Sequence, residues 1–287
     1  MKVAILSMDI EDWYHLDYFH GMDCDKEHSL LDGISVYREI LSEQGIRSSF
    51  FVLGELMQRN RRLLSELVRD GHDLGAHGWN HIRPLKMSLE EFREDLAKSK
   101  QALEDVTGTS VEGYRAPCFS LDRARLNLVR EMGFLFDSSY IPFSGHPLYG
   151  RIDMTGFSES FRGIHRNGDF FEFEVSTLRL AGKDIPVSGG GYLRIFPWCL
   201  MGSLIRRYLK GHDLYTLYIH PFELSPEAGI ALPREVGRVS RLRFNLGRSS
   251  TRRKLLKLIL LLKSEGFRFT TFASLREELM SENASSV

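Results

Sequence analysis

Short apolar runs alternate with segments of helical spacing along most of this chain, and this alternation restricts the fold more than any other feature. Apolar runs typical of buried strands lie at 3–8, 48–53, 73–76, 111–114, 134–137, 214–219 and 267–272. Segments whose apolar residues have helical spacing lie at 30–45, 55–69, 88–108, 122–132, 198–210, 252–265 and 275–280. The alternation predicts right-handed βαβ units, and therefore an α/β protein with parallel strands in a sheet or barrel.

The alternation is interrupted between residues 142 and 197. This stretch contains three consecutive glycines at 189–191 and an alternating piece at 170–175, so we expect loops and short strands there. No linker, internal repeat or low-complexity tract divides the chain, and α/β barrels reach about 250 residues as one unit. We therefore expect one domain over residues 1–280 and a frayed tail at 281–287.

Composition excludes several classes of function. Lys and Arg together number 38, as do Asp and Glu, and this zero net charge argues against a general nucleic-acid binder. Three cysteines without a CxxC spacing suggest neither a disulfide framework nor a zinc knuckle. No apolar run reaches the roughly 18 residues of a membrane span, and the N-terminal run is too short for a signal peptide. We therefore expect a cytoplasmic protein.

Three carboxylates directly follow the first predicted strand. Asp9, Glu11 and Asp12 lie within the run Asp-Ile-Glu-Asp, at a strand end where α/β folds place their sites. Burying them together is costly, because like charges raise one another's pKa. A bound cation would remove that cost; a solvated loop is the alternative.

Two histidines follow the third predicted strand, in the run His77-Gly78-Trp79-Asn80-His81. Their spacing predicts that both imidazoles lie on one face of a helical turn, within reach of one ion. A chance pair is the alternative in a chain with 10 histidines. Taken with the carboxylates, the pair forms a donor set suited to zinc, with positions left open for water and substrate.

Two further polar residues lie at strand ends. Arg115 carries a fixed charge that can orient a carboxylate, and Pro117 stiffens the turn that follows it. His220 directly follows the run 214–219, and histidine is the side chain that exchanges protons most readily near neutral pH. An ordinary turn arginine and a structural histidine are the alternatives.

At these residues the chain resembles the polysaccharide deacetylase family (NodB homology, carbohydrate esterase type) over roughly residues 2 to 275. It is most similar to a subgroup whose first motif reads Asp-x-Glu-Asp-Trp/Tyr. The resemblance implies a single-domain distorted (β/α) barrel of about seven parallel strands. It also implies a hydrolase of carbohydrate metabolism that removes an acetyl group from an N-acetylated sugar of a poly-, oligo- or lipid-linked saccharide. The cofactor implied is a divalent metal, zinc first, with cobalt or nickel as alternatives.

The resemblance also assigns roles to individual residues. Asp9 matches the catalytic base, Arg115 the residue that positions it, Asp137 an acid behind them, and His220 the general acid. The backbone N–H of Cys118, after Pro117, matches the group that binds the oxyanion. Independently of the resemblance, aromatic residues near the site favour stacking on a sugar face, Trp79 and Tyr114 first, with Trp13, Tyr14, Phe119 and Trp198; an ordinary place in the core is the alternative.

His77 and His81 match the two metal histidines. The usual family takes its metal carboxylate from the residue directly after the base, which is Ile10 here. Relatives with a spaced pair use the second position, so we expect Glu11, with Asp12 as the alternative.

Other functions fit the same residues. A related barrel enzyme could hydrolyse another C–N bond, such as that of a cyclic imide or ureide, and an inactive barrel could only bind carbohydrate. Basic residues are frequent at 238–257, before the apolar run 258–262. We expect a solvated helix face there; contact with an anionic glycan, a diphosphate-linked sugar or a membrane surface is the alternative. No nucleic-acid partner is expected, and the oligomeric state stays open.

Overall fold

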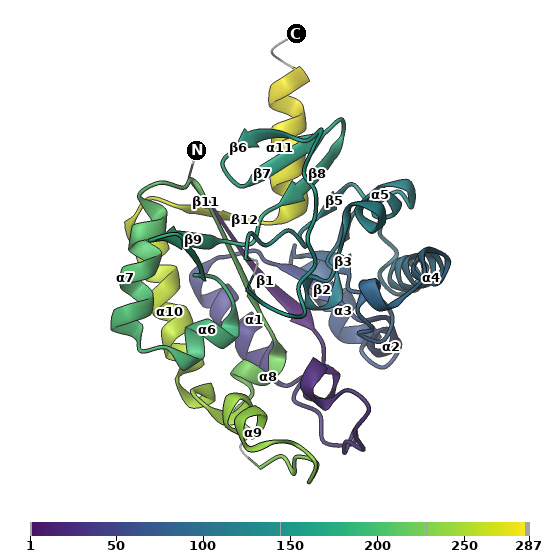
Figure 1. The fold of residues 1–287 in the computed structure, drawn as a ribbon, viewed down its shortest axis with the longest axis vertical. Coiled ribbons are helices and arrows are strands. Elements are labelled where there is room, and N and C mark those ends of the chain that lie inside the picture. Colours follow the sequence, from purple (N-terminus) through teal and green to yellow (C-terminus); the bar gives the residue numbers. More distant parts are fainter. Residues whose placement is uncertain (1, 144, 228, 285–287) are drawn as a thin grey trace.

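The computed structural model describes residues 2–143, 145–227 and 229–284. Its centre is a curved sheet in the order β11-β1-β2-β3-β4-β5-β8-β7-β6, with β12 also pairing with β1, and helices pack around it (Figure 1). The pairs from β11 to β8 and the β1–β12 pair are parallel, whereas β8, β7 and β6 run antiparallel. The α/β class and the distorted barrel are therefore confirmed, and β8 joins the parallel strands that the sequence predicts.

The strands of this sheet are β1 (Val3–Ile10), β2 (Ser49–Val52), β3 (Asp73–Ala76), β4 (Gly113–Tyr114), β5 (Phe136–Asp137), β6 (Ser158–Phe161), β7 (Ile164–Asn167), β8 (Phe170–Phe173), β11 (Leu214–Ile219) and β12 (Arg268–Thr270). The α-helices are α1 (Gly33–Gln44), α2 (Gly54–Met57), α3 (Arg61–Arg69), α4 (Leu89–Thr107), α5 (Arg123–Glu131), α6 (Gly190–Ile195), α7 (Trp198–Leu209), α8 (Pro221–Leu224), α9 (Arg238–Asn245), α10 (Arg248–Ser264) and α11 (Phe272–Ala284). Short 3₁₀ helices are η1 (Trp13–His15), η2 (Asp17–Phe19), η3 (Pro84–Lys86) and η4 (Pro117–Phe119).

Local sequence explains the best-defined elements. Every residue of β1 is buried, as expected for a parallel strand covered on both faces. Helix α4 begins at a capping box, in which the Glu91 N–H donates to Ser88 Oγ (3.2 Å) and the Ser88 N–H donates to Glu91 Oε2 (2.7 Å). The same helix ends at Gly108, which adopts a left-handed conformation with φ 70°.

Aromatic side chains fill the inside of the barrel beneath the carboxyl ends of its strands. The ring of Phe272, at the start of α11, lies 5.8 Å from Phe51, 5.8 Å from Phe136 and 5.1 Å from Phe173 between centroids. All four rings are buried. A second and larger cluster of apolar side chains packs the outer helices onto the sheet. The carboxyl ends of the strands are therefore supported by a packed core of aromatic side chains.

The segment 142–197 contains more structure than the sequence predicts. The antiparallel strands β6, β7 and β8 are joined in one sheet, and β9 (Thr177–Leu180) and β10 (Lys183–Pro186) form a separate hairpin. The glycine run at 189–191 was expected in a loop, but α6 begins at Gly190 within it. The helix expected at 55–69 is divided into α2 and α3.

Hydrogen bonds that involve side chains connect β11 to the residues that follow β8, across the curve of the sheet. The Thr216 N–H donates to Ser176 Oγ (2.9 Å), and the Ser176 N–H donates to Thr216 Oγ1 (3.0 Å). Helix α11 continues to Ala284, so residues 281–284 of the expected frayed tail are helical, and 285–287 lie outside the described residues. No helix within the described ranges is long and apolar enough to cross a membrane.

Candidate active site

A cavity of about 360 Å³ opens at the carboxyl ends of the parallel strands, where α/β barrels place their sites. The ends of β1, β3 and β11 and the turn after β4 all contribute to its wall. Six of the residues predicted for the site line this cavity: Asp9, Glu11, His77, His81, Cys118 and His220.

Three of these side chains form a group with metal-ligand geometry. One ligand atom each from Glu11, His77 and His81 lies within 4.8 Å of the other two, and all three residues are buried. Glu11 Oε2 lies 2.7 Å from His81 Nε2, yet this buried oxygen has no hydrogen-bond partner. Polar atoms that converge without bonding to one another leave a buried position that a cation would satisfy.

The two histidines converge from a loop and not from the helical turn that their spacing predicts. Gly78 has φ 76° and His81 has φ 61°, both in the left-handed region. Asp95 of α4 holds this loop by accepting the Trp79 N–H at Oδ1 (3.1 Å). The imidazole centroids of His77 and His81 are 5.5 Å apart. The pair is thus brought together as expected, by a different backbone path.

His77 is prepared to act as a neutral ligand. Its Nδ1 lies 2.8 Å from the carbonyl oxygen of Arg115, so Nδ1–H donates and Nε2 keeps its lone pair. Burial lowers the pKa of His77 to about 4, so the ring is uncharged at neutral pH. A histidine must be neutral at the ligating nitrogen to bind a metal.

Glu11 is the only carboxylate of the first motif within this group of three. Burial by itself would raise its pKa, but His81, His220 and His77 outweigh burial and hold the pKa of Glu11 well below its usual value. Asp9, the penultimate residue of β1, and Glu11, which directly follows β1, both line the cavity.

Asp12 points elsewhere and acts on the backbone. Its Oδ1 accepts the N–H of Trp13 (2.9 Å) and the N–H of Leu30 (2.8 Å), which caps η1 and fixes the loop that follows β1. Asp12 does not line the cavity. Oδ1 of Asp12 therefore already accepts hydrogen bonds from the protein backbone.

Arg115 holds Asp9. Its Nη1 donates to Asp9 Oδ1 (2.7 Å) and to Ser7 Oγ (2.8 Å), and its Nε donates to the carbonyl of Ser138 (3.1 Å). The guanidinium is fully buried and lies 4.2 Å from the centroid of Phe51. Asp9 therefore has one fixed orientation.

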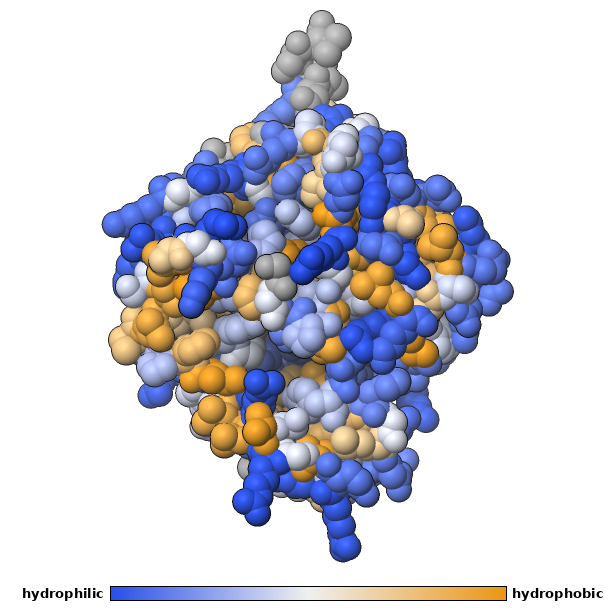
Figure 2. All heavy atoms as spheres, in the orientation of Figure 1, coloured by the Kyte–Doolittle hydropathy of each residue, from blue (hydrophilic) through white to orange (hydrophobic). Residues whose placement is uncertain are grey.

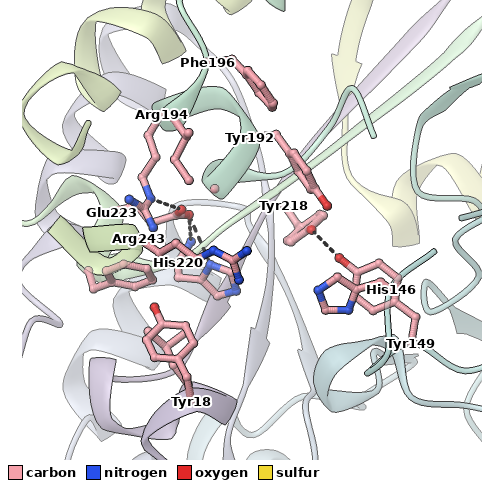
Figure 3. A pocket seen from close by; sticks show the side chains of 14 residues that line it. Tyr18, His146, Tyr149, Tyr192, Arg194, Phe196, Tyr218, His220, Glu223 and Arg243 are labelled. Carbon is pink, nitrogen blue, oxygen red and sulfur yellow. Dashed lines mark hydrogen bonds and ion pairs between the residues drawn. The ribbon is translucent and has the colours of Figure 1, made fainter. Parts of the chain in front are cut away.

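His220 stands between two carboxylates. Its Nε2 lies 3.4 Å from Glu11 Oε1, and its Nδ1 lies 3.2 Å from Glu223 Oε2. Arg194 in turn donates from Nε to Glu223 Oε1 (3.0 Å; Figure 3). Burial alone would lower the pKa of His220, but Glu11 and Glu223 outweigh it and raise the pKa to about 9.

Glu223 was not among the predicted site residues. The signal available was its position three residues after His220, at the start of α8, where its Oε2 also accepts the His220 N–H (3.0 Å). A Glu at this position of a short helix is typical of a capping box. The spacing therefore indicated a contact between the two residues.

Asp137 contacts neither Asp9 nor Arg115 through a hydrogen bond. It accepts the backbone N–H of Ser139 (2.7 Å) and the hydroxyl of Ser139 (2.9 Å), and it shares a hydrogen bond with Glu172. Ser139 Oγ accepts the N–H of Ala116 (2.8 Å). Asp137 thus supports the turn that carries Cys118. Burial raises the pKa of Asp137 to about 6 and the pKa of Glu172 well above its usual value.

The turn after β4 has an unusual backbone. Cys118 has φ 54° and ψ 24°, and Phe119 has φ 51°, so two consecutive non-glycine residues are left-handed. Such conformations cost free energy and occur most often at functional sites. Cys118 lines the cavity, whereas Pro117 does not.

Two predicted substrate contacts were wrong. Tyr114 is fully buried in the core, where its ring packs against Phe92 and Phe134. Trp79 faces a separate hollow, with Lys98 Nζ 3.5 Å from its ring centroid. Neither lines the cavity. Its aromatic wall comes from Phe119, which was among the aromatic residues expected near the site, and from three that were not: Tyr18, Tyr149 and Tyr218.

Two family models match the chain. Residues 35–136 match the polysaccharide deacetylase model, and residues 138–277 match a domain of unknown function, DUF3473. The chain thus contains a stretch that matches the polysaccharide deacetylase family, as the motifs at His77 and Arg115 indicated.

Curated relatives match a part of the chain. The peptidoglycan deacetylase of Helicobacter pylori is 27% identical over 120 residues, which is 42% of this chain and 41% of that protein. The peptidoglycan-N-acetylglucosamine deacetylase PgdA of Listeria monocytogenes is 30% identical over 79 residues, or 28% of this chain and 17% of that protein. The chain therefore spans less than half the length of these relatives.

Solved structures agree with the fold over nearly the whole chain. A Mycobacterium smegmatis protein proposed to be a polysaccharide deacetylase superposes with a TM-score of 0.61 at 18% identity, covering 98% of this chain and 92% of that one. A CE4 family pseudoenzyme from Bacillus anthracis gives a TM-score of 0.55 at 14% identity, covering 96% of this chain and 65% of that one. These likenesses establish the architecture.

Proposed function

We propose that this protein is a metal-dependent N-deacetylase that hydrolyses the acetamido group of an N-acetylated saccharide. The observation that carries the proposal is the arrangement of Glu11, His77 and His81 in one buried cavity that Asp9 and His220 also line. The match of residues 35–136 to the polysaccharide deacetylase model supports acetylated sugar as the substrate class.

The residues present fit a divalent metal. Glu11, His77 and His81 would hold it, and two imidazoles with one carboxylate form a borderline donor set that favours zinc, with cobalt or nickel as substitutes. The unpartnered Glu11 Oε2 is the atom that most requires such an ion. When bound, the ion supplies Lewis-acid polarisation and lowers the pKa of a coordinated water.

The chain's own groups divide the proton transfers between them. Arg115 occupies Oδ1 of Asp9, so Oδ2 is the oxygen left to accept a proton from the attacking water. His220 donates a proton to the departing amine, with Glu223 and Arg194 as positioning residues that fix its ring through Nδ1. Cys118 lines the cavity from its left-handed turn, which supports a role for its backbone N–H in stabilising the developing oxyanion.

The test is acetate release. Purified protein is stripped with a chelator, reloaded with zinc, cobalt or nickel, and assayed on N-acetylglucosamine oligosaccharides and on peptidoglycan fragments. Metal-dependent release that Asp9→Asn abolishes is the expected result. Ring opening of a cyclic imide or ureide without acetate release would replace this function with the alternative hydrolysis. Saccharide binding without turnover of any substrate would indicate an inactive barrel.

A further inference from the structure

The residues drawn in Figure 3 line a second cavity, of about 460 Å³. The two share part of their wall, including Tyr18, Tyr149, Tyr218, His220 and Arg243. Its volume falls within the roughly 300–1,000 Å³ usual for ligand sites. Apart from His220 and its positioning residues Glu223 and Arg194, the residues that line the second cavity have no role in the proposed chemistry.

Two parallel aromatic rings form one wall of this second cavity. Tyr192 and Phe196 lie four residues apart on and directly after α6, with their ring planes 6° apart and their centroids 6.4 Å apart. Both line the cavity, and Phe196 is 38% exposed although it is large and apolar. Aromatic faces that stay open to solvent at a cavity are suited to stacking against the apolar face of a sugar ring.

Among the described residues, Arg243 at the border of the two cavities has no ion-pair or hydrogen-bond partner. Arg243 of α9 lines both cavities, and within the described residues its side chain makes no ion pair or hydrogen bond. Other charged groups nearby already form ion pairs. Arg194 binds Glu223, and Asp17 binds Arg83 (3.1 Å). An arginine is the preferred side chain for bidentate recognition of a carboxylate or phosphate.

We propose that the second cavity binds the sugar unit adjacent to the one deacetylated, and that this unit carries an anionic group. The sugar ring stacks on Tyr192 and Phe196, and its carboxylate or phosphate pairs with Arg243. The substrate is then an acidic saccharide. This inference rests on the proposed deacetylase function of the first cavity.

The test compares three probes with the metal-loaded full chain. They are a neutral N-acetylglucosamine oligosaccharide, an oligosaccharide of the same length that alternates N-acetylglucosamine with a uronic acid, and the nucleotide sugar UDP-N-acetylglucosamine. Wild-type protein is expected to prefer one anionic probe over the neutral one through a lower KM. The uronic acid probe would identify a carboxylate, and the nucleotide sugar a phosphate.

The substitution Arg243→Gln should reduce the ratio of anionic to neutral kcat/KM by about 10- to 100-fold, the usual effect of losing a charged hydrogen bond. The loss should be in KM and should resemble the effect of added salt on the wild type. Arg238→Gln, on the same helix but outside both cavities, is the matched control and should keep the ratio.

An unchanged ratio in Arg243→Gln, or a wild type without preference for either anionic probe, would overturn the inference while leaving the deacetylase function intact. If no probe is turned over, the proposed function fails. Calorimetric titration of the same three probes then still decides the inference, because weaker binding of the anionic probe by Arg243→Gln supports it and equal binding refutes it.

Discussion

Gly190 lies directly against the carboxylate of Glu223. A Cβ atom at this position would stand 1.8 Å from Glu223 Oε2, the oxygen that contacts both the backbone N–H and Nδ1 of His220. The neighbouring Gly191 has far more room, since a Cβ there would lie 4.0 Å from Glu223 Oε1. The absence of a side chain at Gly190 therefore lets α6 approach the acid that orients His220.

The variant Gly190→Ala is expected to displace Glu223 and to lower kcat for acetate release, because His220 loses the contact that fixes its ring. Gly191→Ala is the matched control in the same helix. Alanine favours a helix over glycine by about 1 kcal/mol, so this variant should keep or increase the free energy of unfolding. Urea unfolding of both variants, beside kcat, checks the prediction. Equal stability and equal kcat in the two variants would contradict it.

Metal binding should depend on Glu11 and not on Asp12. We expect Glu11→Gln, His77→Ala and His81→Ala each to lose stoichiometric zinc, because each removes one of three donors within 4.8 Å of each other. Asp12→Asn should keep the metal, since an asparagine oxygen can still accept the Trp13 and Leu30 N–H groups. Zinc content by mass spectrometry after dialysis is the measurement. Metal loss in Asp12→Asn, with retention in Glu11→Gln, would reverse the assignment.

Asp9 and Arg115 should be coupled in stability as well as in activity. Asp9→Asn is expected to lower kcat by about 10²- to 10⁴-fold, the usual contribution of a positioned base, while zinc content stays unchanged. Arg115→Met should reduce the free energy of unfolding by about 3–5 kcal/mol, because it leaves the Asp9 carboxylate buried without its cation. The double variant should recover part of that loss. Strictly additive effects in this cycle would show that the pair does not interact.

Asp137 and Glu172 should make stability depend on pH. Burial raises the pKa of both, so the folded protein keeps a proton that the unfolded chain has already lost. The stabilising contribution is therefore complete below about pH 4 and declines as pH rises through about 6 and beyond, at up to about 1.4 kcal/mol per pH unit. Glu172→Gln supplies a permanent N–H donor to Asp137 and should flatten this decline.

The measurement for this prediction is the free energy of unfolding in urea from pH 5 to pH 8. Relative to the wild type, Glu172→Gln should gain stability as pH rises, and Glu277→Gln, at an exposed position on α11, should follow the wild type. Parallel profiles for Glu172→Gln and the wild type would argue against a shared proton.

The sequence predicted the elements whose pattern is local. The strand 214–219 is β11 with the same bounds, and the capping box of Ser88 and Glu91 begins α4 as expected. Short strands were expected in 142–197, and β8 lies within the alternating piece 170–175, but the helix at Gly190 was not predicted, because tertiary contacts such as the one with Glu223 override a glycine's poor helix propensity.

The errors among the site residues have a common cause in side-chain direction. Tyr114 and Arg115 are consecutive, so when Arg115 points inward to Asp9, Tyr114 must point outward into the core. Asp12 lies beyond β1 and caps η1, so it does not line the cavity as Glu11 does. The sequence shows that side chains alternate along a strand. It does not show which alternate side chains face the cavity, because that depends on partners from distant strands.

The aromatic pair and the arginine of the second cavity come from a different stretch of the chain than the metal-binding group. Tyr192, Phe196 and Arg243 lie within the stretch that matches the domain of unknown function, whereas Glu11, His77 and His81 all precede it. Mutation can therefore alter the choice of polymer without touching the atoms that bind the ion. Under the proposed function, the saccharide bound beside the site can change with Tyr192, Phe196 and Arg243 while the three metal-binding residues stay the same.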